Sequence, residues 1–205
     1  MSPRAVAPPP SELEGGAQGD DAPPDDRYRV EAAAGPGAAD YGELPLAEAA
    51  RLFRWLRLGP EDVFFDLGSG TGKLVLLAAR ETAVGRAVGV ELSAFRHAAA
   101  CERLARLGAP APVELRQEDL RVTDLSDATV IYAGATAFPD PLIGQLAAHV
   151  LAAAPRLRAL LVLRGLPGEW PARFAVRGRL RVATSWGADE WVWVYGPRGG
   201  TVRLP

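Results

Sequence analysis

The chain has 205 residues, of which 48% are hydrophobic, so it can form one domain with a substantial core. Its formal net charge of −2 and isoelectric point near 5.8 give no bulk attraction to nucleic acid or to an anionic membrane. Cys101 is the only cysteine, so no intrachain disulfide can form and a reducing cytoplasm is the expected location. No apolar run of about 20 residues predicts a membrane span. Two histidines and one cysteine, at no familiar ligand spacing, predict no metal site.

Residues 1–38 are rich in proline, alanine, glycine and aspartate and contain almost no large apolar side chain. Such a segment buries too little surface to offset the entropy lost on ordering it. We therefore predict a disordered, mildly acidic tail over residues 1–38 and a single domain over residues 39–205. A partner-binding arm is the alternative interpretation of the tail.

The first predicted helix covers residues 47–58, where Leu52, Trp55 and Leu56 fall on one side. A Gly-Pro pair directly after it ends the helix.

The stretch Val63–Lys73, VFFDLGSGTGK, predicts a buried strand, a glycine-rich turn and the start of an apolar helix that extends to about Val84. Backbone without β-carbons can approach a ligand closely at the carboxyl end of such a strand. The turn is not a P-loop, because Leu67 and Leu74 stand where that loop requires glycine and serine or threonine. It also departs from the dinucleotide fingerprint Gly-x-Gly-x-x-Gly, because its glycines alternate.

Strand and helix patterns then alternate to the end of the chain. A helix begins after the capping residue Ser93 and ends at Gly108, and His97 and Cys101 are interpreted as its structural residues. His149, on a later helix over residues 141–151, is interpreted in the same way. The remaining predicted strands cover residues 87–92, 113–117, 128–133 and 158–164. After an irregular segment over residues 165–179, a hairpin joins residues 180–186 to residues 190–195.

This alternation predicts an α/β fold with a mostly parallel sheet and right-handed crossovers, to which the hairpin adds an antiparallel strand. Ligands bind at the carboxyl ends of the strands in such sheets. Asp66, Glu91, Asp119 and the loop after Ala133 all fall at those ends. Glu91 follows the glycine turn by about the 20 residues that place an acid beside a bound ribose. Asp119 could accept a hydrogen bond from an adenine amino group.

Three motifs make the chain resemble the Dot1-like branch of the class I S-adenosylmethionine (SAM) methyltransferases, a family that methylates protein lysine. The family's Tyr-Gly-Glu loop is matched by Tyr41–Glu43, and its Asp-Leu-Gly-Ser-Gly-x-Gly turn is matched by Asp66–Gly72. A Ser-Trp pair near the final hairpin is matched by Ser185 and Trp186. The resemblance covers about residues 40–195. It implies a Rossmann-like, seven-stranded sheet and SAM as the cofactor, with no metal.

The resemblance also implies roles for individual side chains. Asp66 would face the ammonium group of the cofactor, Glu91 its ribose hydroxyls and Asp119 its adenine amino group. Two aromatic residues, Phe138 and Trp186, would wall a channel for the acceptor side chain. Trp193 would join them, with core packing as its alternative interpretation. The full implied cofactor-binding set is Tyr41, Glu43, Asp66, Gly68, Gly70, Gly72, Lys73, Glu91, Asp119, Leu120 and Gly134.

The sequence departs from the family at four positions in or next to this cofactor-binding set. Gly134 and Ala135 stand where the family places an asparagine near the point of methyl transfer. Leu44 replaces a threonine, and Leu120 replaces an aromatic residue. The basic segment that helps the eukaryotic enzymes grip nucleosomes has no counterpart, so we expect no strong nucleic-acid binding.

The expected function is SAM-dependent methyl transfer to the lysine side chain of a protein substrate. Direct displacement from a sulfonium depends on positioning, and no Ser-His-Asp or Cys-His set is needed. Two alternatives remain open. One is a class I methyltransferase that acts on a small molecule or on another protein group, and the other is a SAM-binding protein without catalytic activity.

Overall fold

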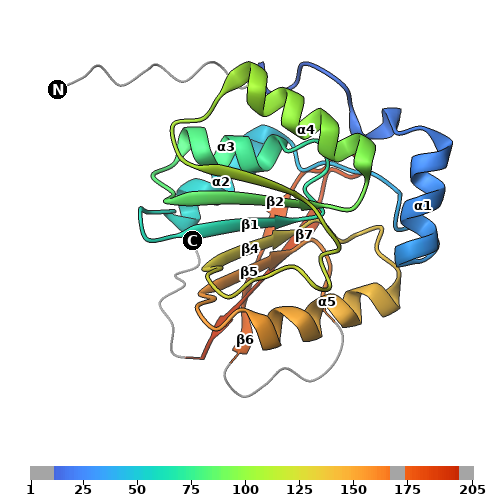
Figure 1. Ribbon diagram of the computed structural model, residues 1–205. Helices are drawn as coiled ribbons and strands as arrows, with labels where there is room; N and C mark the ends of the chain where they lie inside the picture. Colours follow the sequence, from blue (N-terminus) through green and yellow to red (C-terminus); the bar gives the residue numbers. More distant parts are fainter. Residues whose placement is uncertain (1–11, 167–173, 199–205) are drawn as a thin grey trace.

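The structure, a computed structural model, describes residues 12–166 and 174–198. It contains an open, twisted sheet of seven strands in the order β3-β2-β1-β4-β5-β7-β6 (Figure 1). Strands β1 to β5 pair in parallel, while β7 is antiparallel to both of its neighbours. The predicted α/β fold with a mostly parallel sheet and an antiparallel C-terminal hairpin is therefore confirmed. The strands are β1 (Val63–Leu67), β2 (Arg86–Glu91), β3 (Val113–Gln117), β4 (Val130–Ala133), β5 (Ala159–Val162), β6 (Phe174–Val182) and β7 (Glu190–Pro197).

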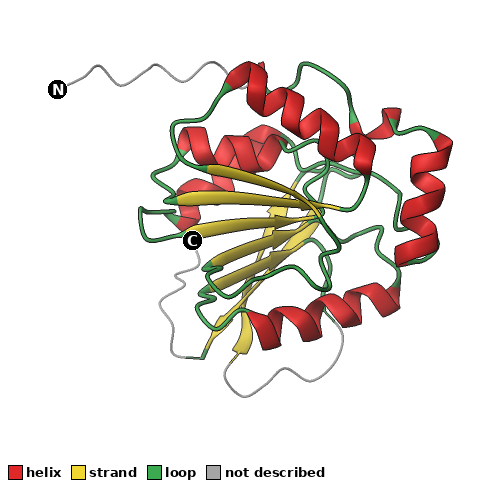
Figure 2. Ribbon diagram, in the orientation of Figure 1, coloured by secondary structure: helices red, strands yellow, loops and turns green. Residues whose placement is uncertain are grey.

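Helices cover both faces of the sheet (Figures 1 and 2). One face carries α2 (Leu46–Leu56), α3 (Lys73–Glu81) and α4 (Ala94–Leu107), and the opposite face carries α5 (Asp140–Ala153). Successive strand residues point to opposite faces, so Phe64 and Phe65 enter two different core clusters although both are fully buried. The central strand is thus apolar apart from Asp66, because both of its faces are covered.

Local sequence signals position the ends of the helices that flank the site. The Ser93 hydroxyl accepts a hydrogen bond from the backbone N–H of Arg96, which caps α4 as predicted. Gly108, with φ of 62°, ends the same helix. The predicted helix over residues 47–58 ends at Leu56, because Arg57 adopts a left-handed conformation with φ of 48°.

The predicted disordered tail is wrong over residues 12–38. A 3₁₀ turn (Gly19–Asp21) precedes α1 (Pro24–Ala34), which lies across the carboxyl edge of the sheet (Figure 1). Composition predicted disorder because the segment has few large apolar side chains. The segment is instead held to the domain largely by polar contacts. The buried Asp26 carboxylate accepts hydrogen bonds from the Ser93 hydroxyl and the Phe95 N–H. Arg103 donates to the carbonyl groups of Gly15 and Ala17.

The predicted irregular segment over residues 165–179 is wrong over residues 174–179, where β6 begins. The pairing register between β6 and β7 shifts between Val176 and Gly178, so the apolar alternation that marks a strand is broken there. Residues 167–173 lie outside the described residues. No helix within residues 12–166 and 174–198 is long and apolar enough to cross a bilayer.

If α1 is part of the folded domain, a charge placed on its buried side should destabilise the protein. Val30 is 5% exposed and packs with Ala38, Ala39 and Leu142. Val30→Asp should lower the free energy of unfolding by about 2–4 kcal/mol, measured by urea denaturation. Tyr28→Asp is the matched control, because Tyr28 lies on the same helix and is 73% exposed. Equal, small effects of both substitutions would mean that α1 does not contribute to stability.

Candidate cofactor-binding site

The backbone of the glycine turn after β1 packs closely against two aromatic rings. Gly68 and Gly70 have φ angles of 84° and 54°, which side chains with a β-carbon rarely adopt. A β-carbon on Gly68 would lie 3.1 Å from the Phe138 ring, and one on Gly70 would lie 2.7 Å from the Tyr41 ring. Glycine is therefore required at both positions, and the turn forms a floor between the two rings.

Two cavities open above this turn at the carboxyl edge of the sheet. The large compartment holds about 780 Å³ of empty space and the small compartment about 390 Å³, and both figures include space open to solvent. Both are lined by Tyr41, Gly42, Gly68 and Gly134, so they adjoin and form one elongated site.

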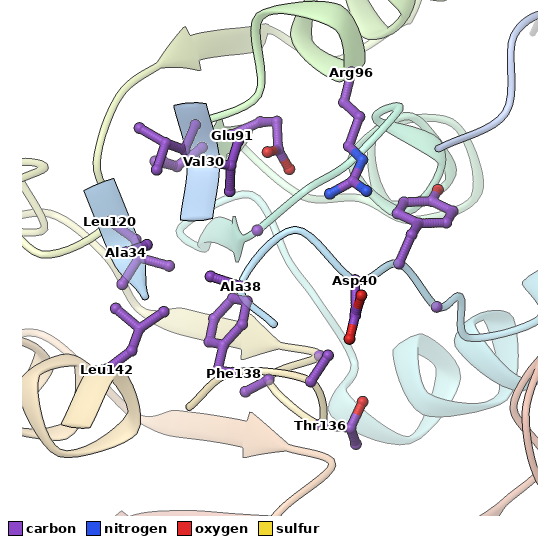
Figure 3. Close-up of a pocket in the computed structure, with 18 of the residues that line it drawn as sticks. Val30, Ala34, Ala38, Asp40, Glu91, Arg96, Leu120, Thr136, Phe138 and Leu142 are labelled. Carbon is purple, nitrogen blue, oxygen red and sulfur yellow. The ribbon is translucent and has the colours of Figure 1, made fainter. Parts of the chain in front are cut away.

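The large compartment is lined mostly by apolar side chains, with Glu91, Asp40 and Arg96 among its charged groups (Figure 3). Glu91 is 7% exposed, and its carboxylate accepts hydrogen bonds from the backbone N–H groups of Gly70 and Ser93, both at 2.8 Å. Burial raises the pKa of Glu91, while these N–H groups and Arg96 oppose the rise. The remaining lone pairs of Glu91 are available to hydroxyl donors in the cavity.

Asp119 lines the same compartment beyond the end of β3 and remains an ionised acceptor. Hydrogen bonds from the Arg121 guanidinium hold the pKa of Asp119 below its usual range, against the effect of partial burial. The Arg121 backbone N–H also donates to it at 2.9 Å. Leu120 lies beside it in the cavity wall. The structure thus brings the predicted residues Glu91, Asp119 and Leu120 together.

The small compartment holds Asp66, which is 3% exposed. Burial, with a contribution from the Glu91 charge, raises the pKa of Asp66 to about 8. A cation entering this compartment would restore the ionised form of Asp66.

The Tyr41–Glu43 loop is fixed by a buried ammonium group. The Tyr41 hydroxyl donates to the Glu43 carboxylate, which accepts from Lys73 Nζ at 2.8 Å. Lys73 Nζ also donates to Glu14 Oε2 at 3.1 Å and to Gln18 Oε1 at 2.7 Å. We call Lys73 and its three acceptors the Lys73 clasp. Because the clasp engages all three N–H bonds of Lys73, this side chain positions the loop, and it also lines the small compartment.

Sequence reasoning missed Arg96 and the lining residues of α1, Val30 and Ala34. Arg96 is 4% exposed, stacks over the Tyr41 ring at 4.8 Å and donates to the carbonyl groups of Gly19 and Ala39. A signal was present in the sequence. Arg96 and Arg103 lie seven residues apart on the buried, alanine-rich side of α4, where an arginine requires partners.

Two of the three predicted channel residues reach the site. Phe138 and Trp186 line the large compartment, and Trp186 lies so close to Gly42 that a β-carbon there would be 2.3 Å from the indole. Trp193 lines neither compartment. It pairs with Val162 of β5 and packs against the core on the α5 side. The guanidinium carbon of Arg179 lies 5.0 Å from the centre of its ring.

Comparisons with known proteins agree with this architecture. A solved RNA methyltransferase from Salinibacter ruber, in complex with S-adenosyl-L-homocysteine, superposes with a TM-score of 0.61 at 23% identity, covering 80% of this chain and 96% of that one. The structure is therefore a class I methyltransferase fold, as expected from the sequence.

The family comparison is more specific. Residues 35–107 match the family profile described as "Histone methylation protein DOT1". The matched residues include the Tyr41–Glu43 loop and the glycine turn. The chain is therefore similar to the Dot1-like methyltransferases over these residues, in agreement with the resemblance drawn from the motifs. A histone-lysine N-methyltransferase, H3 lysine-79 specific, from Caenorhabditis elegans is 45% identical over 53 residues, 26% of this chain and 6% of that protein. A protein-lysine N-methyltransferase from Saccharolobus islandicus is 28% identical over 91 residues, 44% of this chain. The chain spans 56% of the length of this second relative.

The raised pKa of Asp66 predicts how stability depends on pH. The folded protein keeps a proton on Asp66 up to about pH 8, whereas the unfolded chain releases it near 3.8, so this stabilisation is lost as pH rises between these values. Asp66→Asn removes the titration. Between pH 5 and pH 8, the unfolding free energy of the ligand-free wild type should fall relative to the variant by up to about 1.4 kcal/mol per pH unit. Parallel pH profiles in urea denaturation would contradict this prediction.

Proposed function

We propose that the protein is a SAM-dependent methyltransferase that transfers a methyl group to a lysine side chain of a protein substrate. The observation that carries this proposal is the pair of adjoining compartments above the glycine turn, with an acid in each at the carboxyl edge of the sheet. Their chemistry fits the two ends of SAM, a nucleoside and an amino acid joined at a sulfonium.

The residues fit the two halves of the cofactor in different ways. In the large compartment, Glu91 would accept hydrogen bonds from the ribose hydroxyls, and Asp119 would accept one from the adenine amino group. Leu120 would contact a face of the base. In the small compartment, Asp66 would pair with the ammonium group. The sulfonium would then lie at the junction, near Gly68 and Gly134.

When bound, SAM supplies an activated methyl group, and the protein's part is to position the acceptor and exclude water. A lysine must lose its proton before it can attack, and its unperturbed pKa is about 10.4. Phe138 and Trp186 would surround the amine with apolar surface, which disfavours its charged form and lowers that pKa. Their ring faces would also attract the positively charged sulfonium methyl group of the cofactor, by about 0.5–2 kcal/mol.

The names of the relatives, both lysine methyltransferases, favour a protein acceptor. Gly134 and Ala135 keep the alternatives open, since an asparagine is expected there in the family and the loop here has no side-chain amide. Transfer to a small molecule, and cofactor binding without transfer, are therefore the competing proposals. A cytoplasmic location remains part of the proposal and follows from the single cysteine.

The test uses methyl-labelled SAM and separates the three proposals. The full chain is incubated with labelled SAM and an extract of its source cells, and label is counted in precipitated protein and in the small-molecule fraction. Label in protein, recovered as methyl-lysine after hydrolysis and absent with Gly70→Arg, is the expected result. Label only in small molecules would contradict the protein acceptor. Calorimetric SAM binding with no transfer would contradict an enzymatic role.

The two tryptophans of the C-terminal region give a matched test of the channel. Trp186→Ala should reduce kcat for methyl transfer about tenfold or more and leave cofactor affinity within about twofold, because the lost contacts act on the acceptor. Trp193→Ala is the control and should leave kcat unchanged, because that side chain lies outside both compartments. A loss of kcat in the control alone would restore the channel role predicted for Trp193 and exclude it for Trp186.

A further inference from the structure

We propose that the hydroxyl of Tyr132 binds the ammonium group of the cofactor's amino-acid half, beside Asp66. This role rests on the proposed function. It assigns a second polar ligand to the amino-acid end of the site, from a residue for which neither the sequence motifs nor the comparisons provide a role.

Tyr132 lies next to Asp66 in the sheet. The two residues are direct partners in the parallel register of β4 and β1, so their side chains leave the same face at the carboxyl edge. Both line the small compartment, and Tyr132 is 6% exposed. Its hydroxyl lies 4.0 Å from the point where a β-carbon on Gly134 would stand, so it reaches toward the junction of the compartments.

The polar groups of Tyr132 and Asp66 are unpaired. Within residues 12–166 and 174–198, neither the Tyr132 hydroxyl nor the Asp66 carboxyl group has a hydrogen-bond partner. Buried polar groups usually have partners, because leaving one unpaired is costly. Both side chains line the small compartment, so a polar ligand bound there would supply their missing hydrogen-bond partner.

The other charged groups of the small compartment are already paired with one another. Glu43 and Lys73 form an ion pair at 2.8 Å within the Lys73 clasp, and Glu43 also accepts from Tyr41. Asp66, Tyr132 and the Ser69 hydroxyl therefore remain for the ligand, and a bound cation would restore the ionised form of Asp66. Burial raises the pKa of Tyr132, so its hydroxyl stays neutral and its oxygen can accept a hydrogen bond from an ammonium group.

The placement distinguishes the ammonium from the other positive group of the cofactor. Tyr132 lines the small compartment and is absent from the lining of the large one, whereas the sulfonium would lie at the junction between them. A hydroxyl on the small-compartment side of this junction matches the amino-acid end. Losing it should therefore affect only ligands that carry that end.

The test compares two ligands that differ in the amino-acid half. S-adenosylhomocysteine carries it, and 5′-methylthioadenosine lacks it. For Tyr132→Phe, calorimetry should give a Kd for S-adenosylhomocysteine about tenfold or more above that of the wild type, as for a lost hydrogen bond to a charged group. The Kd for 5′-methylthioadenosine should stay within about twofold.

Tyr195→Phe is the matched control, because Tyr195 is a buried tyrosine of the same sheet whose hydroxyl accepts from the Leu166 N–H outside both compartments. It should leave both Kd values unchanged. Equal losses for both ligands in Tyr132→Phe would assign Tyr132 a structural role and overturn the proposal. A fall in kcat with an unchanged Kd for S-adenosylhomocysteine would also overturn it, since the hydroxyl would then act on the methyl acceptor. A wild type that binds neither ligand would instead refute the proposed function on which this role depends.

Discussion

The site depends on one backbone constraint, the alternation of left-handed glycines between Asp66 and Lys73. Each glycine of this turn lies against a different part of the protein: Gly68 against Phe138, Gly70 against Tyr41, and Gly72 against Ala100 of α4. The turn therefore sets the distance between the sheet edge, the loop after β4 and the loop before α2. A side chain at Gly68 or Gly70 would push against a ring that lines the site, and one at Gly72 would push against α4.

Positively charged side chains hold the N-terminal segment against this turn through hydrogen bonds. Lys73, Arg96 and Arg103 all project from the body of the domain and donate to residues 14–19, and Arg96 also donates to Ala39. These are hydrogen bonds from buried or half-buried cations, which are stronger than neutral ones. The Lys73 clasp also links this segment to the Tyr41–Glu43 loop. One polar network thus joins the N-terminal segment and the Tyr41–Glu43 loop to the body of the domain.

The sequence predicted the sheet and its edge because both depend on local patterns. Apolar strands, alternate glycines and acids after strands identified Asp66, Glu91 and Asp119. The sequence did not reveal α1 or the role of Arg96, because both depend on hydrogen bonds between residues more than 50 positions apart. The sequence also suggested a channel role for Trp193, which lines neither compartment. The alternation of side chains along a strand predicts the face on which a residue lies, but not how far that residue is from the cavity. Tyr132 was hidden in an apolar strand, where its hydroxyl had no visible partner to suggest a role.

Calorimetric titration of the full chain with S-adenosylhomocysteine at pH 7, repeated in two buffers of different ionisation enthalpy, tests the central claim most directly. Near this pH the pKa of about 8 leaves most Asp66 side chains protonated, and a bound ammonium group should expel that proton. One-to-one binding whose enthalpy differs between the buffers, corresponding to release of a proton, is the predicted result. No binding, or binding with the same enthalpy in both buffers, would contradict the assignment of Asp66 and the small compartment to the cofactor's amino-acid end.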